Sequence, residues 1–177
     1  MSEQLTQHDI KRLFNLLNDE LKNQSVEGEL YLVGGAVMCL VYNARPATKD
    51  VDALFQPTKK LRQAAAKVGL QAGIKGDWLN DAVKGYVSNQ GKFNIFLELS
   101  HLRIFVSRPD YLLAMKCLAL RIGEEFHDLN DIRYLLRYLN ITTYQNALDV
   151  ITRYYPLERF PQKTLYALEE LVEEGNM

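Results

Sequence analysis

The first apolar pattern along the chain repeats every three to four residues, as it does in an amphipathic helix. The positions that share one side of this helix are Ile10, Leu13, Phe14, Leu17 and Leu21. A polar run from Thr6 to Asp9 precedes them and has the residue types that cap helices. We therefore predict a capped first helix whose apolar side lies against a sheet.

Short β-prone runs alternate with helical spacing over the first two thirds of the chain. The pattern predicts strands at 29–33, 50–55, 85–88, 94–99 and 102–106. Between them it predicts helices at 35–43 and 58–68, the second ending at Gly69 and Gly73, and an irregular or short helical piece at 77–81.

From Pro109 onward the pattern is helical throughout. Helices are predicted at 109–121, 125–140, 143–154 and 162–174. No internal repeat or low-complexity linker separates this part from the rest. The predicted fold class is α/β, more specifically α+β: residues 1–107 form a small mixed sheet flanked by helices, and residues 108–177 form a helical region packed on it, or the two make one compact domain.

Composition agrees with a compact chain. Of its 177 residues, 47% are hydrophobic and 24% are charged, which is enough apolar surface for a sizeable core. The net charge of -1 gives no global basic field, so binding of nucleic acid would need a local patch. Cys39 and Cys117 each lie in an apolar helical run and are expected to be small core residues, not a disulfide or metal ligands.

The start of the chain and the length of its apolar runs indicate the cellular compartment to expect. No charged segment followed by an apolar one opens the sequence, and no apolar run approaches the length that spans a membrane. We therefore expect a cytoplasmic protein without a membrane partner.

Residues 29–55 combine a glycine pair with two carboxylates. The predicted strand at 29–33 stops at Gly34 and Gly35, where a helix follows, and backbone N–H groups at such a turn can approach a phosphate that the helix dipole also favours. Asp50 and Asp52 are predicted to share one face of the next strand, because side chains alternate along a strand. Neighbouring carboxylates repel one another unless they are solvated or share a cation, and Mg²⁺ is usually held by one or two carboxylates plus substrate phosphates.

The ordered set Gly34-Gly35-Ala36, Arg45-x-x-Thr48 and Asp50-x-Asp52 resembles the signature of the DNA polymerase β-like nucleotidyltransferases. The spacing is longer than in the minimal polymerase-type signature, and the added Arg-x-x-Thr is similar to the branch of bacterial nucleotidyltransferase-like toxins. Further segments, at 78–85, 102–116 and 128–132, resemble an uncharacterised bacterial subgroup of these proteins, so that the likeness covers about residues 30 to 140.

The resemblance implies a magnesium-dependent nucleotidyltransferase that moves a nucleoside monophosphate from a nucleoside triphosphate to a hydroxyl acceptor. Asp50 and Asp52 would hold Mg²⁺ or Mn²⁺. The acceptor that the family suggests is a transfer RNA or a protein, and the chain would then be a growth-inhibiting toxin with an antitoxin partner. The residues expected at the nucleotide phosphates are Gly34, Gly35, Arg45 and Thr48. For Arg45 and Thr48 a solvated loop is the alternative.

Lys116 lies on a helix that is otherwise apolar. Its neighbours one turn away include Leu112, Leu113 and Leu120, so the ammonium has no polar side to reach and needs a partner. The candidates, Asp128 and Asp131, open the next helix. The resemblance implies a functional Lys116 with Asp128, or alternatively with Asp131. The purely structural interpretation is a salt bridge with Asp128 as a helix N-cap and Asp131 as its acidic partner.

No strong motif marks a third metal carboxylate. Glu98 is the first candidate because this fold commonly supplies one from a later strand, and Asp77 and Asp81 come after it. His101 and His127 have no metal-ligand spacing. The cations that could meet an RNA backbone, or could simply form a solvated face, are Lys59, Lys60, Arg62 and Lys67.

Two other function classes fit the same residues. One is a nucleotide-binding or regulatory protein of this fold without turnover. The lack of a strong motif for a third metal carboxylate supports it. The other is an antitoxin-like interaction module. The tyrosines of the helical region either pack within the bundle or form an interface; they are Tyr134, Tyr138, Tyr144, Tyr154 and Tyr155.

Overall fold

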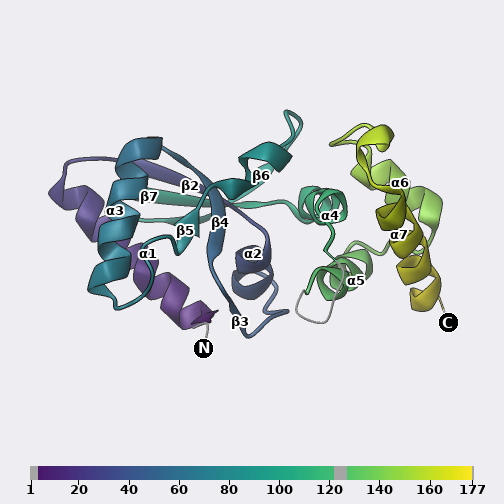
Figure 1. The fold of residues 1–177 in the computed structure, drawn as a ribbon, viewed down its shortest axis with the longest axis horizontal. Helices are drawn as coiled ribbons and strands as arrows, with labels where there is room; N and C mark the ends of the chain where they lie inside the picture. The colour runs from purple at the N-terminus through teal and green to yellow at the C-terminus, as the bar shows by residue number, and fades with distance from the viewer. Residues whose placement is uncertain (1–3, 122–126, 177) are drawn as a thin grey trace. The chain divides into compact units, whose positions relative to one another are not determined.

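The structure, a computed structural model, describes residues 4–121 and 127–176 (Figure 1). The chain divides into two compact units. The sheet unit consists of Met1–Gly85 with Phe93–Ser107, and the helical unit consists of Tyr86–Lys92 with Arg108–Met177. Residues 86–92, which we assign to the first region from sequence, thus group with the helices.

The sheet unit contains a five-stranded mixed sheet with the order β5-β4-β2-β7-β6. Its strands are β2 (Gly28–Val33), β4 (Val51–Gln56), β5 (Leu79–Asn80), β6 (Phe93–Glu98) and β7 (Leu102–Ser107). Strand β2 runs antiparallel to β4 and parallel to β7, while β4 is parallel to β5 and β6 is antiparallel to β7. The predicted mixed α/β class is confirmed.

Helices α1 (Gln7–Asn23) and α3 (Thr58–Gln71) cover one face of this sheet (Figure 1). Leu21 of α1 and Leu61 of α3 both lie beside Gly28 of β2. The predicted cap of α1 is present, because the Thr6 hydroxyl accepts from the N–H of Asp9 and the Asp9 carboxylate accepts from the N–H of Thr6.

The second face of the sheet carries its side chains in rows, since partner positions on neighbouring strands lie side by side. The first row contains Asn80 on β5, Asp52 on β4 and Val33 on β2. The second row contains Leu54, Tyr31, Phe105 and Ile95. The third row contains Gln56, Glu29, Arg103 and Glu98. The rows fix how far each candidate carboxylate lies from Asp52.

Several predicted boundaries are wrong. Helix α2 (Gly35–Leu40) is shorter than 35–43, because Asn43 has a φ of 50° and the chain turns back. Residues 85–88 are not a strand, since a 3-10 helix, Ala82–Tyr86, occupies their start. Helix α3 passes through Gly69 and ends before Gly73, whose φ is 76°.

The structure also contains a two-stranded sheet that the sequence pattern does not predict. It joins β1 (Leu5–Thr6) to β3 (Ala47–Thr48) in antiparallel register. Because the strands have two residues each, they carry no alternating pattern that a sequence could reveal.

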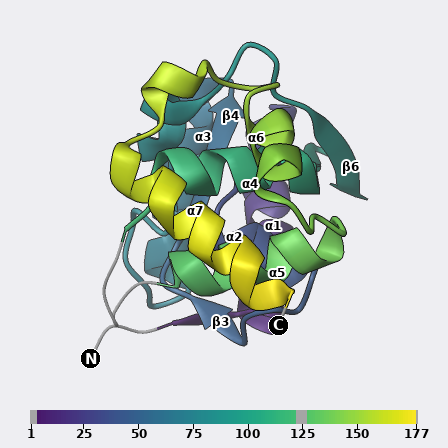
Figure 2. The ribbon, with the colours of Figure 1, turned by 90° about the vertical axis from the view of Figure 1, so that its right-hand side faces the viewer.

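The helical unit is a small bundle. Its elements are α4 (Pro109–Leu118), α5 (Asp128–Tyr138), α6 (Tyr144–Ile151), a 3-10 turn at Leu157–Arg159 and α7 (Gln162–Gly175). Helix α4 packs against the other three, and α7 runs beside α5 (Figure 2). Residues 125–126 of the predicted helix 125–140 lie outside the described residues. Within the described ranges, no helix is long and apolar enough to cross a membrane.

Hydrogen bonds tie residues 86–92 to this bundle. The N–H of Ser88 donates to the hydroxyl of Tyr111, and the hydroxyl of Tyr155 donates to the carbonyl of Tyr86. The ring of Tyr111 lies so close to Gly91 that a Cβ there would be 2.5 Å from the ring.

We expect Gly69→Ala to lower the free energy of unfolding by about 1 kcal/mol or more, because overpacking exceeds the gain in helix propensity. A Cβ at Gly69 would lie 2.7 Å from the Lys75 carbonyl oxygen and 2.8 Å from Cδ1 of the buried Trp78. Urea unfolding followed by the fluorescence of Trp78, the one tryptophan of the chain, measures the loss. Gly85→Ala, with open space around it, is the control; equal losses in both variants would contradict this packing.

Candidate functional site

The turn after β2 has a backbone conformation that only glycine adopts readily. Gly34 has a φ of 72° and a ψ of −150°. A Cβ at this position would lie 3.2 Å from Oδ2 of Asp52. The carboxylate of Asp52 therefore lies directly against the glycine backbone.

The second glycine of the turn is more crowded still. A Cβ at Gly35 would lie 2.5 Å from Nη1 of Arg45 and 3.0 Å from Oγ1 of Thr48. The hydroxyl of the buried Thr48 donates to the backbone carbonyl of Asp50 at 3.2 Å. The structure thus brings together the glycine turn, the loop that carries Arg45, and the start of β4.

The two aspartates differ in surroundings. Asp52 is the second residue of β4 and lies half-buried on the second face of the sheet. Asp50 precedes β4, its side chain is 36% exposed, and its Oδ2 lies 3.9 Å from Nζ of Lys75. The ammonium of Lys75 therefore lies beside the Asp50 carboxylate, while the Asp52 carboxylate lies at the glycine turn. Two carboxylates two positions apart are the ligand type that suits Mg²⁺ or Mn²⁺. The residues present therefore fit a hard divalent cation.

Glu98 lies in the wrong part of the sheet to be a third metal carboxylate. It belongs to the third row, opposite Arg103, whereas Asp52 lies in the first row. Four residues along a strand span roughly 13 Å, so Glu98 is too far from Asp52 to share a metal ion with it. The expectation that Glu98 is a third metal ligand is therefore wrong. The sequence could not reveal this, because it does not show the register of β6.

The later aspartates have other surroundings. Asp81 pairs with Lys84 at 2.7 Å and with Arg62 at 2.6 Å. The hydrogen bond from Lys84 and the charge of Arg62 lower the pKa of this carboxyl. Asp77 is exposed on the turn before β5. Across the described ranges, His, Cys, Asp and Glu side chains form no group of three or more that could hold a metal ion.

Two residues near the site, Asn80 and Lys75, are not predicted from the sequence. Asn80 on β5 is the direct partner of Asp52, so their side chains lie side by side on the same face. Lys75 approaches Asp50 from the turn after α3. The signal for Asn80 is weak, since β5 has only two residues and follows the buried Trp78.

The positive charge at the turn comes from a side chain more than from a helix dipole. Helix α2 has only six residues, so its dipole is smaller than the predicted longer helix would supply. Arg45 lies at its start instead. Within α2, burial raises the pKa of the Cys39 thiol although the charge of Arg45 opposes this shift, so Cys39 stays a neutral core residue.

In the helical unit, Lys116 is buried and bonds to both candidate aspartates. Its Nζ lies 3.1 Å from Oδ1 of Asp128 and 2.8 Å from Oδ2 of Asp131. Arg121 adds a side-chain hydrogen bond of 3.0 Å to Asp128. Both carboxylates therefore pair with the lysine, so Asp128 and Asp131 are joint partners of Lys116 and not alternatives.

Asp128 is not the N-cap of α5. The helix begins at Asp128 itself, and its N-cap, His127, makes no side-chain capping bond. Burial disfavours the ionised carboxylate of Asp128, but the hydrogen bonds from Arg121 and the charge of Lys116 outweigh burial and lower its pKa. The two bases and two acids form a neutral, closely paired network.

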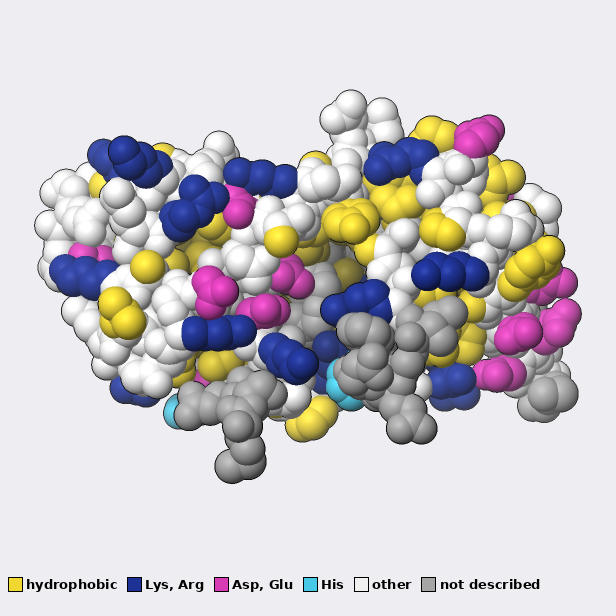
Figure 3. Space-filling model, viewed as in Figure 1, with side chains coloured by type: hydrophobic (Ala, Val, Ile, Leu, Met, Phe, Trp, Pro, Cys, Tyr) yellow, Lys and Arg dark blue, Asp and Glu magenta, His cyan; other side chains and the backbone are white. Residues whose placement is uncertain are grey.

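The basic face of α3 is partly neutralised. Lys67 pairs with Glu20 at 3.0 Å and Arg62 pairs with Asp81. Over the face of the molecule in Figure 3, Lys and Arg side chains are interspersed with Asp and Glu side chains. These pairs favour a solvated charged face over a continuous RNA-binding stripe on this helix.

Comparisons of the chain with protein-family models, with curated proteins and with solved structures found no match. The function of the site therefore has to be inferred from the chemistry of its own residues.

We expect Gly34→Ala to lower the free energy of unfolding by about 1–3 kcal/mol, because alanine is strained at this backbone conformation and its methyl group meets Asp52. Gly73→Ala is the matched control, since Gly73 also has a positive φ but has open space around it. The loss at Gly34 should exceed that at Gly73, and combining Gly34→Ala with Asp52→Ala should reduce the excess. Chemical denaturation gives the free energy of unfolding of the parent and the three variants. Equal losses at the two glycines would show that Asp52 does not lie against the turn.

Asp128→Asn should cost about 3 kcal/mol at neutral pH, because it leaves a buried lysine with one carboxylate fewer. The folded-state pKa of Asp128 lies below its ordinary value of 3.8, so its stabilising effect is complete above about pH 5 and is lost as pH falls through the lowered pKa. The difference in unfolding free energy between the parent and the variant should therefore narrow in acid. Asp149→Asn on the exposed side of α6 is the control; a difference that grows toward low pH would contradict the pairing.

Proposed function

We propose that the chain is a magnesium-dependent nucleotidyltransferase of the DNA polymerase β-like type. The observation that carries the proposal is the convergence, around one glycine turn, of residues that lie up to 18 positions apart in the sequence. They are Gly34, Gly35, Arg45, Thr48 and Asp52, with Asp50 adjacent. Each has the chemistry that binding of a metal–triphosphate complex requires.

In this proposal Asp50 and Asp52 hold the divalent cation. When bound, Mg²⁺ would neutralise charge on the phosphates and lower the pKa of the acceptor hydroxyl. The backbone of Gly34 and Gly35 can approach phosphate oxygens closely because no Cβ intervenes. Arg45 supplies a guanidinium that can bind a phosphate oxygen with two donors.

The neighbouring polar residues position these groups. The bond from Thr48 to the Asp50 carbonyl fixes the backbone between Arg45 and the aspartates. Lys75 offsets the charge of Asp50 and is close enough to offer a second cation to a phosphate. In the reaction the acceptor oxygen forms a bond to the α-phosphorus, the bond to the bridging oxygen breaks, pyrophosphate leaves, and the acceptor proton passes to water.

Lys116 and Asp128 are assigned a functional role by family resemblance only. The resemblance implies that Lys116 acts together with Asp128, and within the helical unit the buried ammonium is paired with both Asp128 and Asp131. A transfer RNA or a protein hydroxyl would be the acceptor, and an antitoxin would be the partner.

A nucleotide-binding protein without turnover is the second candidate. One observation favours it: Asn80, an amide, lies beside Asp52 where a carboxylate would complete a set of three. This candidate predicts magnesium-dependent binding of nucleotide without a transferred product.

The direct test supplies magnesium, each of the four labelled nucleoside triphosphates in turn, and total RNA or total protein as acceptor. The parent protein should give a labelled product, and Asp50→Asn and Asp52→Asn should each reduce the rate by about a hundredfold or more. Asp19→Asn, an equal change of charge on exposed surface of α1, should leave the rate unchanged.

Unchanged transfer by both site variants would contradict the proposal. Binding of nucleotide by calorimetry that is lost in Asp52→Asn, with no product from either acceptor pool, would support the second candidate instead.

A further inference from the structure

The second face of the sheet carries a row of apolar side chains that is only partly covered. On the first face, Leu30, Ala53 and Ile104 are completely buried. The second row of the second face is half-buried on three strands and exposed on the fourth; it contains Leu54, Tyr31, Phe105 and Ile95. Ile95 is 55% exposed. A continuous apolar row at the surface marks a place that another molecule covers.

The aromatic rings of this row are held in place by one another. Tyr31 stacks on Phe105, with ring centroids 4.8 Å apart and planes 8° apart, and meets Phe93 edge-on at 5.2 Å. The guanidinium carbon of Arg103 lies 5.7 Å from the centroid of the Phe105 ring. Because the Tyr31 ring is held from two sides, the row offers ring edges and aliphatic side chains more than a free ring face for stacking.

Negative charge lies on both sides of the apolar row. The first row contains the carboxylate of Asp52. In the third row Glu29 pairs with Arg103 at 2.7 Å, so the exposed Glu98 gives that row a net charge of one negative unit. Positions two apart along a strand are separated by about 7 Å. A molecule that covers the apolar row therefore meets acidic side chains on either side of it.

The dimensions of this surface match an α-helix. The apolar row crosses four neighbouring strands and is roughly 14 Å long, which is the length of a helix of about three turns. The two acidic rows are roughly 13 Å apart, close to the diameter of a helix with its side chains. A helix can present an apolar line with basic residues on both sides, whereas an extended segment presents a single line of side chains to one face.

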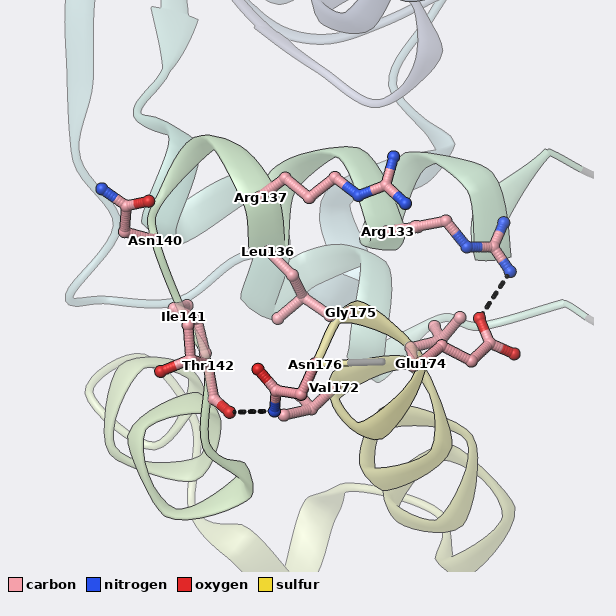
Figure 4. Close-up of a pocket in the computed structure, with 11 residues that line it drawn as sticks. Arg133, Leu136, Arg137, Asn140, Ile141, Thr142, Val172, Glu174, Gly175 and Asn176 are labelled. Atoms are coloured by element: carbon pink, nitrogen blue, oxygen red, sulfur yellow. Dashed lines mark hydrogen bonds and ion pairs between the residues drawn. The ribbon is translucent and has the colours of Figure 1, made fainter.

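The pocket of the helical unit differs from this surface because its polar side chains have partners (Figure 4). It lies at the ends of α5 and α7, where Arg133 pairs with Glu174 at 3.1 Å. The amide of Asn176 donates to the backbone carbonyl of Thr142 at 2.6 Å. These groups are satisfied within the helical unit.

We propose that the second row, with Asp52 on one side and Glu98 on the other, docks an amphipathic helix of another protein whose apolar line is flanked by Lys or Arg. Each α-helix that the structure describes exposes at most one large apolar side chain, so a second copy of this chain does not supply the partner helix. A polynucleotide is disfavoured because its phosphates would meet both acidic rows.

A helix docked on this row also covers Asp52, so the partner would block the proposed metal site. This inhibitory consequence rests on the proposed function, whereas the docking itself does not. The test contains neither metal nor nucleotide, so its failure leaves nucleotidyl transfer untouched.

The test measures fluorescence anisotropy of a labelled model peptide with the full chain. The peptide has about eighteen residues, with Leu along one line of the helix and Lys on both sides of that line. A second peptide has the same composition in an order that spreads Leu evenly around the helix. The first peptide should bind about tenfold more tightly than the second, because only the first can bury an apolar line on the row.

Two variants of the surface separate its apolar and acidic parts. Ile95→Thr keeps a β-branched side chain in β6 and should weaken binding of the first peptide several-fold at every salt concentration. Glu98→Gln should weaken it about two- to fivefold in low salt, and this loss should disappear at about 0.5 M salt, where exposed charges are screened.

The controls make similar changes on the helices that cover the first face. Leu70→Thr alters a side chain that is 73% exposed on α3, and Asp19→Asn removes an exposed carboxylate from α1. Both should bind the peptide as the parent does, and circular dichroism confirms that all four variants fold.

Preference for the first peptide that both surface variants weaken and both controls keep supports the proposal. Absence of binding by the parent protein would overturn it, as would equal binding of the two peptides or equal losses in the controls. Displacement of the peptide by an unlabelled RNA strand as effective as displacement by unlabelled peptide would also overturn it, because the surface would then accept a polynucleotide.

Discussion

The close approach of Asp52 to the backbone of Gly34 is the constraint on which the rest of the site depends. It requires a residue without a Cβ at a φ of 72°, and it brings the carboxylate to the end of β2 through the pairing of Val33 with Asp52. The start of the chain supports the same region. Thr6 caps α1 and pairs with Ala47 of β3, while the side chain of Gln7 donates to the last carbonyls of α2. The end of α2 and strand β3, which flank the loop of Arg45, are thus both hydrogen-bonded to the start of the chain.

The helical unit depends on a different balance. A lysine buried among leucines carries a desolvation cost, which two carboxylates and Arg121 offset only if all of them stay paired. Such a network specifies how α4 meets α5, because moving either helix would leave a buried charge unpaired. It also fixes the orientation of α5 about its own axis. Arg137 and Tyr138, both exposed, then face outward because the core side of α5 is committed to the buried residues Asp128, Asp131, Ile132, Leu135 and Leu136.

The sequence predicts the elements that depend on local residue patterns. It does not predict the contacts that depend on pairing between distant strands. The apolar repeat from Ile10 to Leu21, the strands around Gly34 and the ionic partners of Lys116 are all readable, because each follows from spacing or from the cost of burying a charge. The register of β6, which moves Glu98 away from Asp52, is not readable, since a β-bulge and the partner strand set it. Asn80 and Lys75 are missed for the same reason: only the parallel pairing of β5 with β4 and the turn before it bring them to the aspartates.

The central claim is that Asp50, Asp52 and the glycine turn together bind a metal–triphosphate complex. The most direct test is a crystal structure of the chain with Mn²⁺ and a non-hydrolysable nucleoside triphosphate, in which anomalous scattering locates the metal. The account predicts a manganese peak at bonding distance from the carboxylates of Asp50 and Asp52, with phosphate oxygens beside Gly34, Gly35 and Arg45. A nucleotide bound elsewhere, or manganese bound without contact to either aspartate, would contradict it.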